Sequence, residues 1–188
     1  MKDFITSIGP ILPLISVLIG SIIAFTTTRY FSKKTDDRAI RQTAAQLAQH
    51  LDVFSNNCSK VISENELFYA SSGAAGTLSY RIPSLPPLPE NVDLQLVEAV
   101  ALSRLLSLGL KRKLASEALD FNYSMEVGPD PDPDETNQQC GILGMEAVEI
   151  AEMMRSGAKL PEPNYGKYHY DFSTKLRAQK ILALKHRF

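Results

Sequence analysis

Three aspartates in this sequence have the types and spacing from which a calcium site could be built. Asp130, Asp132 and Asp134 alternate like the opening of an EF-hand loop. That loop requires glycine at its sixth position and glutamate at its twelfth, where this chain has Glu135 and Gly141. The prolines between the aspartates also prevent the tight turn that aims oxygens at calcium. We therefore interpret the segment as an exposed acidic linker and predict no metal there.

The histidines could bind metal or transfer protons, but they are scattered. His50, His169 and His186 do not lie at a metal-ligand spacing from one another, from a cysteine or from a carboxylate. We expect His50 on the surface of a helix. His169 lies in a segment rich in rings, which is typical of binding loops, although such rings also cover the open ends of helical bundles. The candidate partner-binding residues are Tyr165, Tyr168, His169 and Tyr170.

The two cysteines, Cys58 and Cys140, are far apart in the sequence and form no C-x-x-C pair. Neither has a neighbouring pattern of histidine or basic residues that would lower the pKa of the thiol, so we predict free, buried thiols. No serine lies in a G-x-S-x-G motif. The segment Gly73-x-x-Gly76 lacks the Lys-Ser/Thr ending of a phosphate-binding loop.

Three glutamates, Glu146, Glu149 and Glu152, follow one another at three-residue spacing. They lack the E-x-x-H partner of a di-metal carboxylate site, so we interpret them as a solvated helix face. The sequence predicts no catalytic residue, no metal and no cofactor. A small membrane-bound enzyme is the less favoured alternative, and its pocket would have to gather His169, Asp171 and a cysteine or glutamate.

The elements that position these residues begin with a long apolar segment. The run from Phe4 to Thr28 has no charged side chain, and 13 of its residues are Phe, Ile, Leu or Val. As a helix it would rise about 37 Å, against a hydrocarbon core of about 30 Å. Pro10 and Pro13 delimit its start, which leaves a straight part from Ile11 to Phe31. A cleaved signal peptide fits less well, because the run exceeds the usual apolar length and no A-x-A site follows.

The residues after this run predict a membrane boundary and an orientation. Tyr30 and Phe31 would lie at headgroup level, with Lys33 and Lys34 just beyond them. Lys2 is the single basic residue before the run, whereas five follow it closely: Arg29, Lys33, Lys34, Arg38 and Arg41. This asymmetry predicts a signal-anchor over residues 1–31 and a cytosolic domain over residues 32–188.

The cytosolic part opens with the sharpest periodic pattern of the chain. Apolar residues recur with a 4-3 spacing at Ile40, Ala44, Leu47, Leu51, Phe54, Cys58 and Val61. This pattern predicts either a self-associating coiled-coil stalk or the first helix of an intramolecular bundle. We favour the bundle, because three heptads are short and two of the seam residues are small.

The remaining sequence alternates predicted helices with two proline-rich loops. The first loop begins near Ser71 and continues through 82–89, which is expected to lie as a strap over the core rather than in an SH3-like groove. Helices are predicted at 92–107, ending at Gly109, and at 110–125, with an apolar stripe of Leu110, Leu114, Ala118, Phe121 and Met125. A further helix ends at Gly157, and after the loop 160–170 a basic amphipathic helix runs from Phe172 to the end. This last helix either closes the bundle or contacts anionic lipid.

The predicted fold class is therefore mainly α, with one transmembrane helix followed by a bundle of four to five helices. A net charge of -1 gives no overall attraction to nucleic acid. The layout resembles that of short single-pass inner-membrane proteins of bacteria, and this resemblance of architecture transfers no functional residue. It implies an interaction or accessory module at the inner membrane. Its predicted partners are the lipid bilayer and another membrane or cytosolic protein, and a homo-oligomer is left open. An envelope or phage-lysis type of protein, with its domain outside the cytoplasm, is the alternative.

Overall fold

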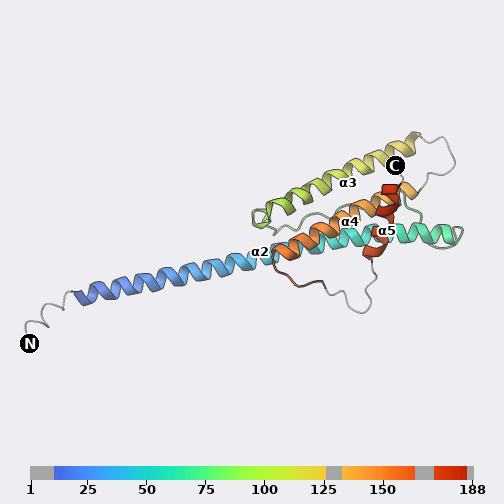
Figure 1. The fold of residues 1–188 in the computed structure, drawn as a ribbon. Coiled ribbons are helices and arrows are strands. Elements are labelled where there is room, and N and C mark those ends of the chain that lie inside the picture. The colour runs from blue at the N-terminus through green and yellow to red at the C-terminus, as the bar shows by residue number, and fades with distance from the viewer. Residues whose placement is uncertain (1–10, 126–132, 164–171, 186–188) are drawn as a thin grey trace, which may run out of the picture. The chain divides into compact units, whose positions relative to one another are not determined.

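The fold is mainly helical, as predicted. The computed structural model describes the backbone of residues 11–125, 133–163 and 172–185. Within these ranges it describes the side chains from Lys34 onward, apart from Met125 and Phe172. Before Lys34 it describes the side chains of Phe25, Thr28 and Arg29. The helices are α2 (Ile11–Ala70), α3 (Ala99–Met125), α4 (Pro133–Gly157) and α5 (Phe172–Lys185), and η1 (Leu94–Leu96) is a short 3-10 helix. Among these residues there is no strand (Figure 1). Two compact units cover residues 1–40 and 41–188.

The first unit contains the run for which a membrane anchor is predicted. Helix α2 begins at Ile11, the residue at which the straight part of the anchor is expected to start. Residues 1–10 and the side chains of 11–24, which make up most of the run, lie outside the description. Across the described residues, no helix is both long and apolar enough to cross a bilayer. The membrane-spanning role of this segment stays a prediction.

The second unit is a helical bundle organised around α4. Helix α4 buries about half of its residues, from Pro133 at its start to Met154 near its end, because α2, α3 and α5 pack around it (Figure 1). Leu47, Leu51 and Phe54 of α2 are fully buried in the same core. The 4-3 pattern of α2 therefore serves an intramolecular bundle, which confirms the favoured interpretation over the stalk.

Helix α5 approaches α4 closely because two glycines leave room for it. A Cβ atom at Gly141 would lie 2.5 Å from Cβ of Gln179, and one at Gly144 would lie 2.6 Å from Cδ2 of Leu176. Leu176 and Ala183 are buried, so α5 closes the bundle through these residues, while Ile181, Leu182 and Leu184 stay exposed. Any side chain larger than hydrogen at the two glycine positions would push the helices apart.

Helix α3 corrects the prediction of two helices separated at Gly109. It is continuous from Ala99 to Met125, and a Cβ atom at Gly109 would have no neighbour within 4 Å. An isolated glycine costs a helix only about 1 kcal/mol, and this cost is offset by burial of Leu105, Leu108 and Leu119 on the core side. The predicted apolar stripe from Leu110 does not enter the core. Its exposed members include Leu110 (59%), Leu114 (54%) and Phe121 (61%).

The loop after α2 is held against the bundle by Asn65. The Nδ2 atom of this fully buried side chain donates hydrogen bonds to the Ser79 carbonyl (2.9 Å) and to Oδ1 of Asn137 (2.9 Å). Its Oδ1 accepts from the Ser79 amide (2.7 Å). Gly76 has φ +81°, and a Cβ atom there would lie 2.5 Å from the Glu64 carbonyl oxygen, so the loop passes directly over α2.

The proline-rich segment 82–89 is a strap over the core, as expected. Ile82 is buried, and Leu85 packs against the core cluster. The expectation for His50 was wrong, because this residue lies beneath the strap with only 8% of its surface exposed. Burial lowers the pKa of His50, and a hydrogen bond to the backbone of Pro86 partly opposes this shift. Since proline has no N–H, the imidazole is the donor and the Pro86 carbonyl is the acceptor.

Candidate functional site

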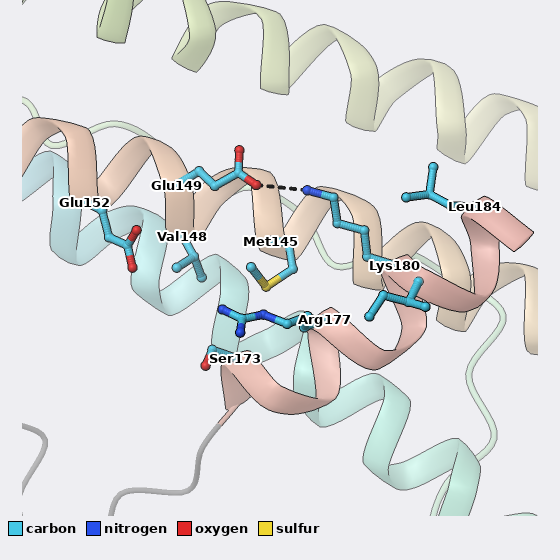
Figure 2. Close-up of a pocket in the computed structure, with 9 residues that line it drawn as sticks. Met145, Val148, Glu149, Glu152, Ser173, Arg177, Lys180 and Leu184 are labelled. Carbon is cyan, nitrogen blue, oxygen red and sulfur yellow. Dashed lines mark hydrogen bonds and ion pairs between the residues drawn. The ribbon is translucent and has the colours of Figure 1, made fainter.

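A groove between α4 and α5 is the cavity that we assign as the candidate site. It has a volume of about 380 Å³, and the residues that line it are Met145, Val148, Glu149, Glu152, Ser173, Arg177, Lys180, Ile181 and Leu184. Figure 2 shows that α4 provides the apolar floor with Met145 and Val148, while α5 provides the cations Arg177 and Lys180. Its position follows from the glycine contacts, because the close approach of α5 to α4 sets the walls of the groove.

One wall of the groove is an ion-pair network on Glu149. Lys180 of α5 donates a hydrogen bond to Oε1 of Glu149 (2.8 Å), and Arg104 of α3 donates one to Oε2 (2.9 Å). The hydrogen bond from Lys180 is the main cause that lowers the pKa of Glu149, and the one from Arg104 acts in the same direction. The carboxylate therefore joins three helices, although its partial exposure limits each pair to about 1 kcal/mol or less.

The glutamates of α4 are thus not the solvated face that the sequence indicates. Glu146 accepts a hydrogen bond from Lys111 of α3 at 2.6 Å and its side chain is only 13% exposed. Glu149 contacts α3 and α5, and Glu152 is the exposed member of the three. The three-residue spacing correctly placed the glutamates on one face of α4. The cations that pair with them come from α3 and α5, and the spacing along α4 does not predict these partners.

Arg177 is the cation of the groove that remains available to a ligand. Within the described part of the chain, no carboxylate lies at ion-pairing distance from its guanidinium, whereas Lys175 and Lys180 of the same helix are paired with Glu66 and Glu149. Figure 2 shows the Arg177 side chain reaching along the groove beside Val148. An exposed guanidinium above an apolar floor suits a ligand that combines an apolar surface with a carboxylate or phosphate.

A second groove, of about 400 Å³, lies between α2 and the strap. The residues that line it include Lys60, Glu64 and Arg81. The Glu64 carboxylate accepts a hydrogen bond from the Thr77 amide (3.1 Å) and so helps to hold the loop. We assign this groove a structural role, because its polar groups serve the attachment of the loop to α2.

The cysteines are free and buried, as predicted, but the structure brings them together. Cys58 of α2 and Cys140 of α4 are both fully buried, and their thiols lie next to each other. Burial raises the pKa of Cys58 well above its usual value, and the contact with Cys140 raises it further. A protonated, inaccessible thiol is a poor nucleophile, so this pair belongs to the core and not to a reactive site.

The partner-binding candidates Tyr165, Tyr168, His169 and Tyr170 lie outside the described residues, as does Asp171. Their role in binding a partner stays a prediction. The described residues contain no group of three metal-ligating side chains. Asp134 is exposed in the first turn of α4, where a carboxylate stabilises the helix.

At the predicted membrane boundary, the side chains of Tyr30, Phe31 and Lys33 lie outside the description, and Lys34 is exposed on α2. Just before them, the Arg29 guanidinium lies over the Phe25 ring at 5.9 Å from its centroid.

Sequence reasoning did not identify the α4–α5 groove, because the groove depends on where α5 crosses α4. Comparison with protein-family models, with curated proteins and with solved structures finds no match to this chain.

Proposed function

We propose that this chain is a single-pass membrane-anchored protein whose helical bundle holds a partner at the cytoplasmic side of the inner membrane. The observation that carries the proposal is the uncharged run from Phe4 to Thr28, followed by a cluster of basic residues. Large apolar residues each favour insertion by about 0.3 to 0.6 kcal/mol near the bilayer centre. The sum over this run is several kcal/mol in favour of the membrane.

The α4–α5 groove supports the role of the bundle as an interaction module. It combines an apolar floor with the guanidinium of Arg177, and it lies on the outside of a core that is already filled. The two thiols are buried and so are not available as nucleophiles. The partner that suits this groove is a protein segment that presents apolar side chains together with a carboxylate.

The tether is tested by extraction of membranes at alkaline pH. We expect the full-length chain to stay in the pellet and Leu18→Arg to be released, because a charged side chain at the centre of a span costs about 2.5 to 3.5 kcal/mol. Leu67→Arg is the matched control, since Leu67 lies on the same helix and is 49% exposed. Release of the unchanged protein, or retention of both variants, would refute the anchor.

Orientation and partner binding need separate measurements. A C-terminal reporter that works only in the cytoplasm should be active, whereas activity of a periplasm-only reporter would favour the envelope type of protein. For binding, Arg177→Glu should deplete the proteins recovered with the chain from solubilised membranes, while Lys185→Glu, an exposed cation on the same helix, should not. If the unchanged chain, Arg177→Glu and Lys185→Glu all recovered the same amount of partner, the groove would be excluded as the docking site.

The ring-rich segment offers an independent test of the same function. Alanine replacements at Tyr165, Tyr168 and Tyr170 should weaken recovery of the partner and leave the fold intact, because loops present contact area that packing does not require. His169→Ala alone should have little effect. Complete loss of cellular activity in a normally folded His169→Ala protein would favour an enzyme over a tether.

A further inference from the structure

Helix α3 carries a second apolar surface that the bundle does not use. Its core side buries Ala101, Leu105, Leu108 and Leu119. Because successive residues of an α-helix are rotated by about 100°, residues 106, 110, 117 and 121 lie nearly opposite Leu108, and residue 114 lies beside them. The exposed side chains of this face are Leu106 (60%), Leu110 (59%), Leu114 (54%) and Phe121 (61%). Four large apolar residues on one helix face form a patch of the kind that marks protein contacts. We call this surface the α3 stripe.

The charges along the α3 stripe are divided by sign. Lys113 precedes its midpoint and Glu117 and Asp120 follow it, whereas Lys111 lies toward α4 and pairs with Glu146. Lys113 lies 3.8 Å from Glu117 of its own helix, and the side chains of Lys113, Glu117 and Asp120 are all exposed. Two such helices placed in parallel would bring like charges together, whereas an antiparallel pair brings the basic half of one helix to the acidic half of the other. The stripe is therefore complementary to itself in one direction only.

We propose that the α3 stripe is a dimer interface in which α3 pairs with α3 of a second copy of this chain, antiparallel and about a twofold axis. The axis passes between Ala115 and Ser116, so that Leu110 faces Phe121 of the second copy and Leu114 faces Glu117. The same register brings Lys113 close to Asp120 of the second copy, since both lie on the same edge of the stripe. A contact between identical patches is the usual form of a closed dimer.

This interface does not depend on the membrane tether or on the α4–α5 groove. It uses α3 alone, on the side that faces away from α4 (Figure 1). The α4 side of the helix is occupied by its contacts with the core, including the ion pairs of Arg104 and Lys111 with Glu149 and Glu146. Loss of the anchor would therefore leave the dimer intact, and loss of the dimer would leave the anchor intact.

The first test compares two equally exposed positions of α3. Leu110→Asp removes one buried leucine from each copy and should weaken dimerisation of the full-length, detergent-solubilised chain about 100-fold. Val100→Asp should leave it unchanged, because Val100 is 56% exposed but its counterpart in this register lies beyond the end of α3 at Met125. Mass measurement by light scattering distinguishes these outcomes, and circular dichroism checks that both variants fold.

The second test measures orientation. Spin labels on Ser103→Cys, an exposed position, should be separated by about 37 Å along the helix axis in the antiparallel pair, whereas a parallel pair would bring them together. The native thiols are buried and so leave the introduced cysteine as the accessible one. A monomeric wild-type chain at high concentration, a dimer that survives Leu110→Asp, or a short distance between the labels would each overturn the proposal.

Discussion

Gly144 of α4 lies directly against Leu176 of α5, with no space for a side chain between them. A Cβ atom at Gly144 would come within 2.6 Å of the Leu176 side chain and within 3.2 Å of Cβ of Cys58. Gly144 therefore sets the distance between α4 and two other helices at once. The close packing of α2, α4 and α5 at this level depends on the absence of one methyl group.

Gly144→Ala should lower the free energy of unfolding by about 1 to 3 kcal/mol, because an added methyl group overpacks the contact. Gly109→Ala is the matched control. Gly109 lies within α3, where a Cβ atom has open space, so this substitution should stabilise the protein by about 0.5 to 1 kcal/mol. Urea denaturation followed by circular dichroism measures both. Destabilisation by Gly109→Ala would contradict the continuous α3 helix.

Leu51→Ala should cost about 2 to 5 kcal/mol of stability, because Leu51 is fully buried in the bundle core and its truncation leaves a cavity. Val53→Ala, two residues away on the same helix, should change stability by less than about 0.5 kcal/mol, since Val53 is 45% exposed. The same denaturation experiment compares them. Similar effects at the two positions would indicate that α2 packs on a different face.

The protein should lose stability as the pH falls below about 6.5, the ordinary pKa of histidine, because His50 is buried. Burial lowers the pKa of His50 in the folded chain, so between the folded and unfolded pKa values the unfolded chain binds more protons. Stability is then greatest above the unfolded pKa and decreases through this window. His50→Gln retains a donor for the Pro86 carbonyl but does not titrate, and it should flatten the profile between pH 7.5 and 5. An unchanged profile would show that His50 is not the titrating group.

Cys58 and Cys140 should react slowly with a water-soluble disulfide reagent in the native protein and rapidly after denaturation. Both thiols are fully buried, and the raised pKa of Cys58 keeps its thiol protonated. Absorbance of the released thiolate gives the rate and the number of reacting groups. Fast reaction of either thiol in the native chain would show that the α2–α4 contact opens readily.

The sequence predicted those features of the fold that depend on periodicity along one helix. The 4-3 pattern from Ala44 to Cys58 placed the core face of α2 correctly, and the prolines after Ile82 identified the strap. On α3, apolar periodicity predicted the wrong core face. Leu110 and Leu114, which are exposed, are as apolar as Leu105 and Leu108, which are buried. Periodicity shows that two faces are apolar but does not show which one the bundle covers.

The site was less predictable, because it depends on contacts between distant segments. The pairing of Glu149 with Arg104 and Lys180 joins residues 45 and 31 positions apart, and no local rule selects these partners. The prediction that His50 lies on the surface was wrong for a similar reason, because the strap that covers it begins some thirty residues later in the chain. The small residues Gly141 and Gly144 were the available signal that a helix would cross α4 closely.

The arrangement of α2 against α4 also has a consequence for synthesis on the ribosome. The contacts between these helices are remote in sequence, as in the hydrogen bond from Ser55 to the Gly144 carbonyl across 89 residues and the ion pair of Asp52 with Arg155 across 103 residues. At about 5 to 20 residues per second, the core face of α2 waits roughly 5 to 20 seconds before α4 emerges. During that interval the leucines of this face have no α4 to pack against in the nascent chain.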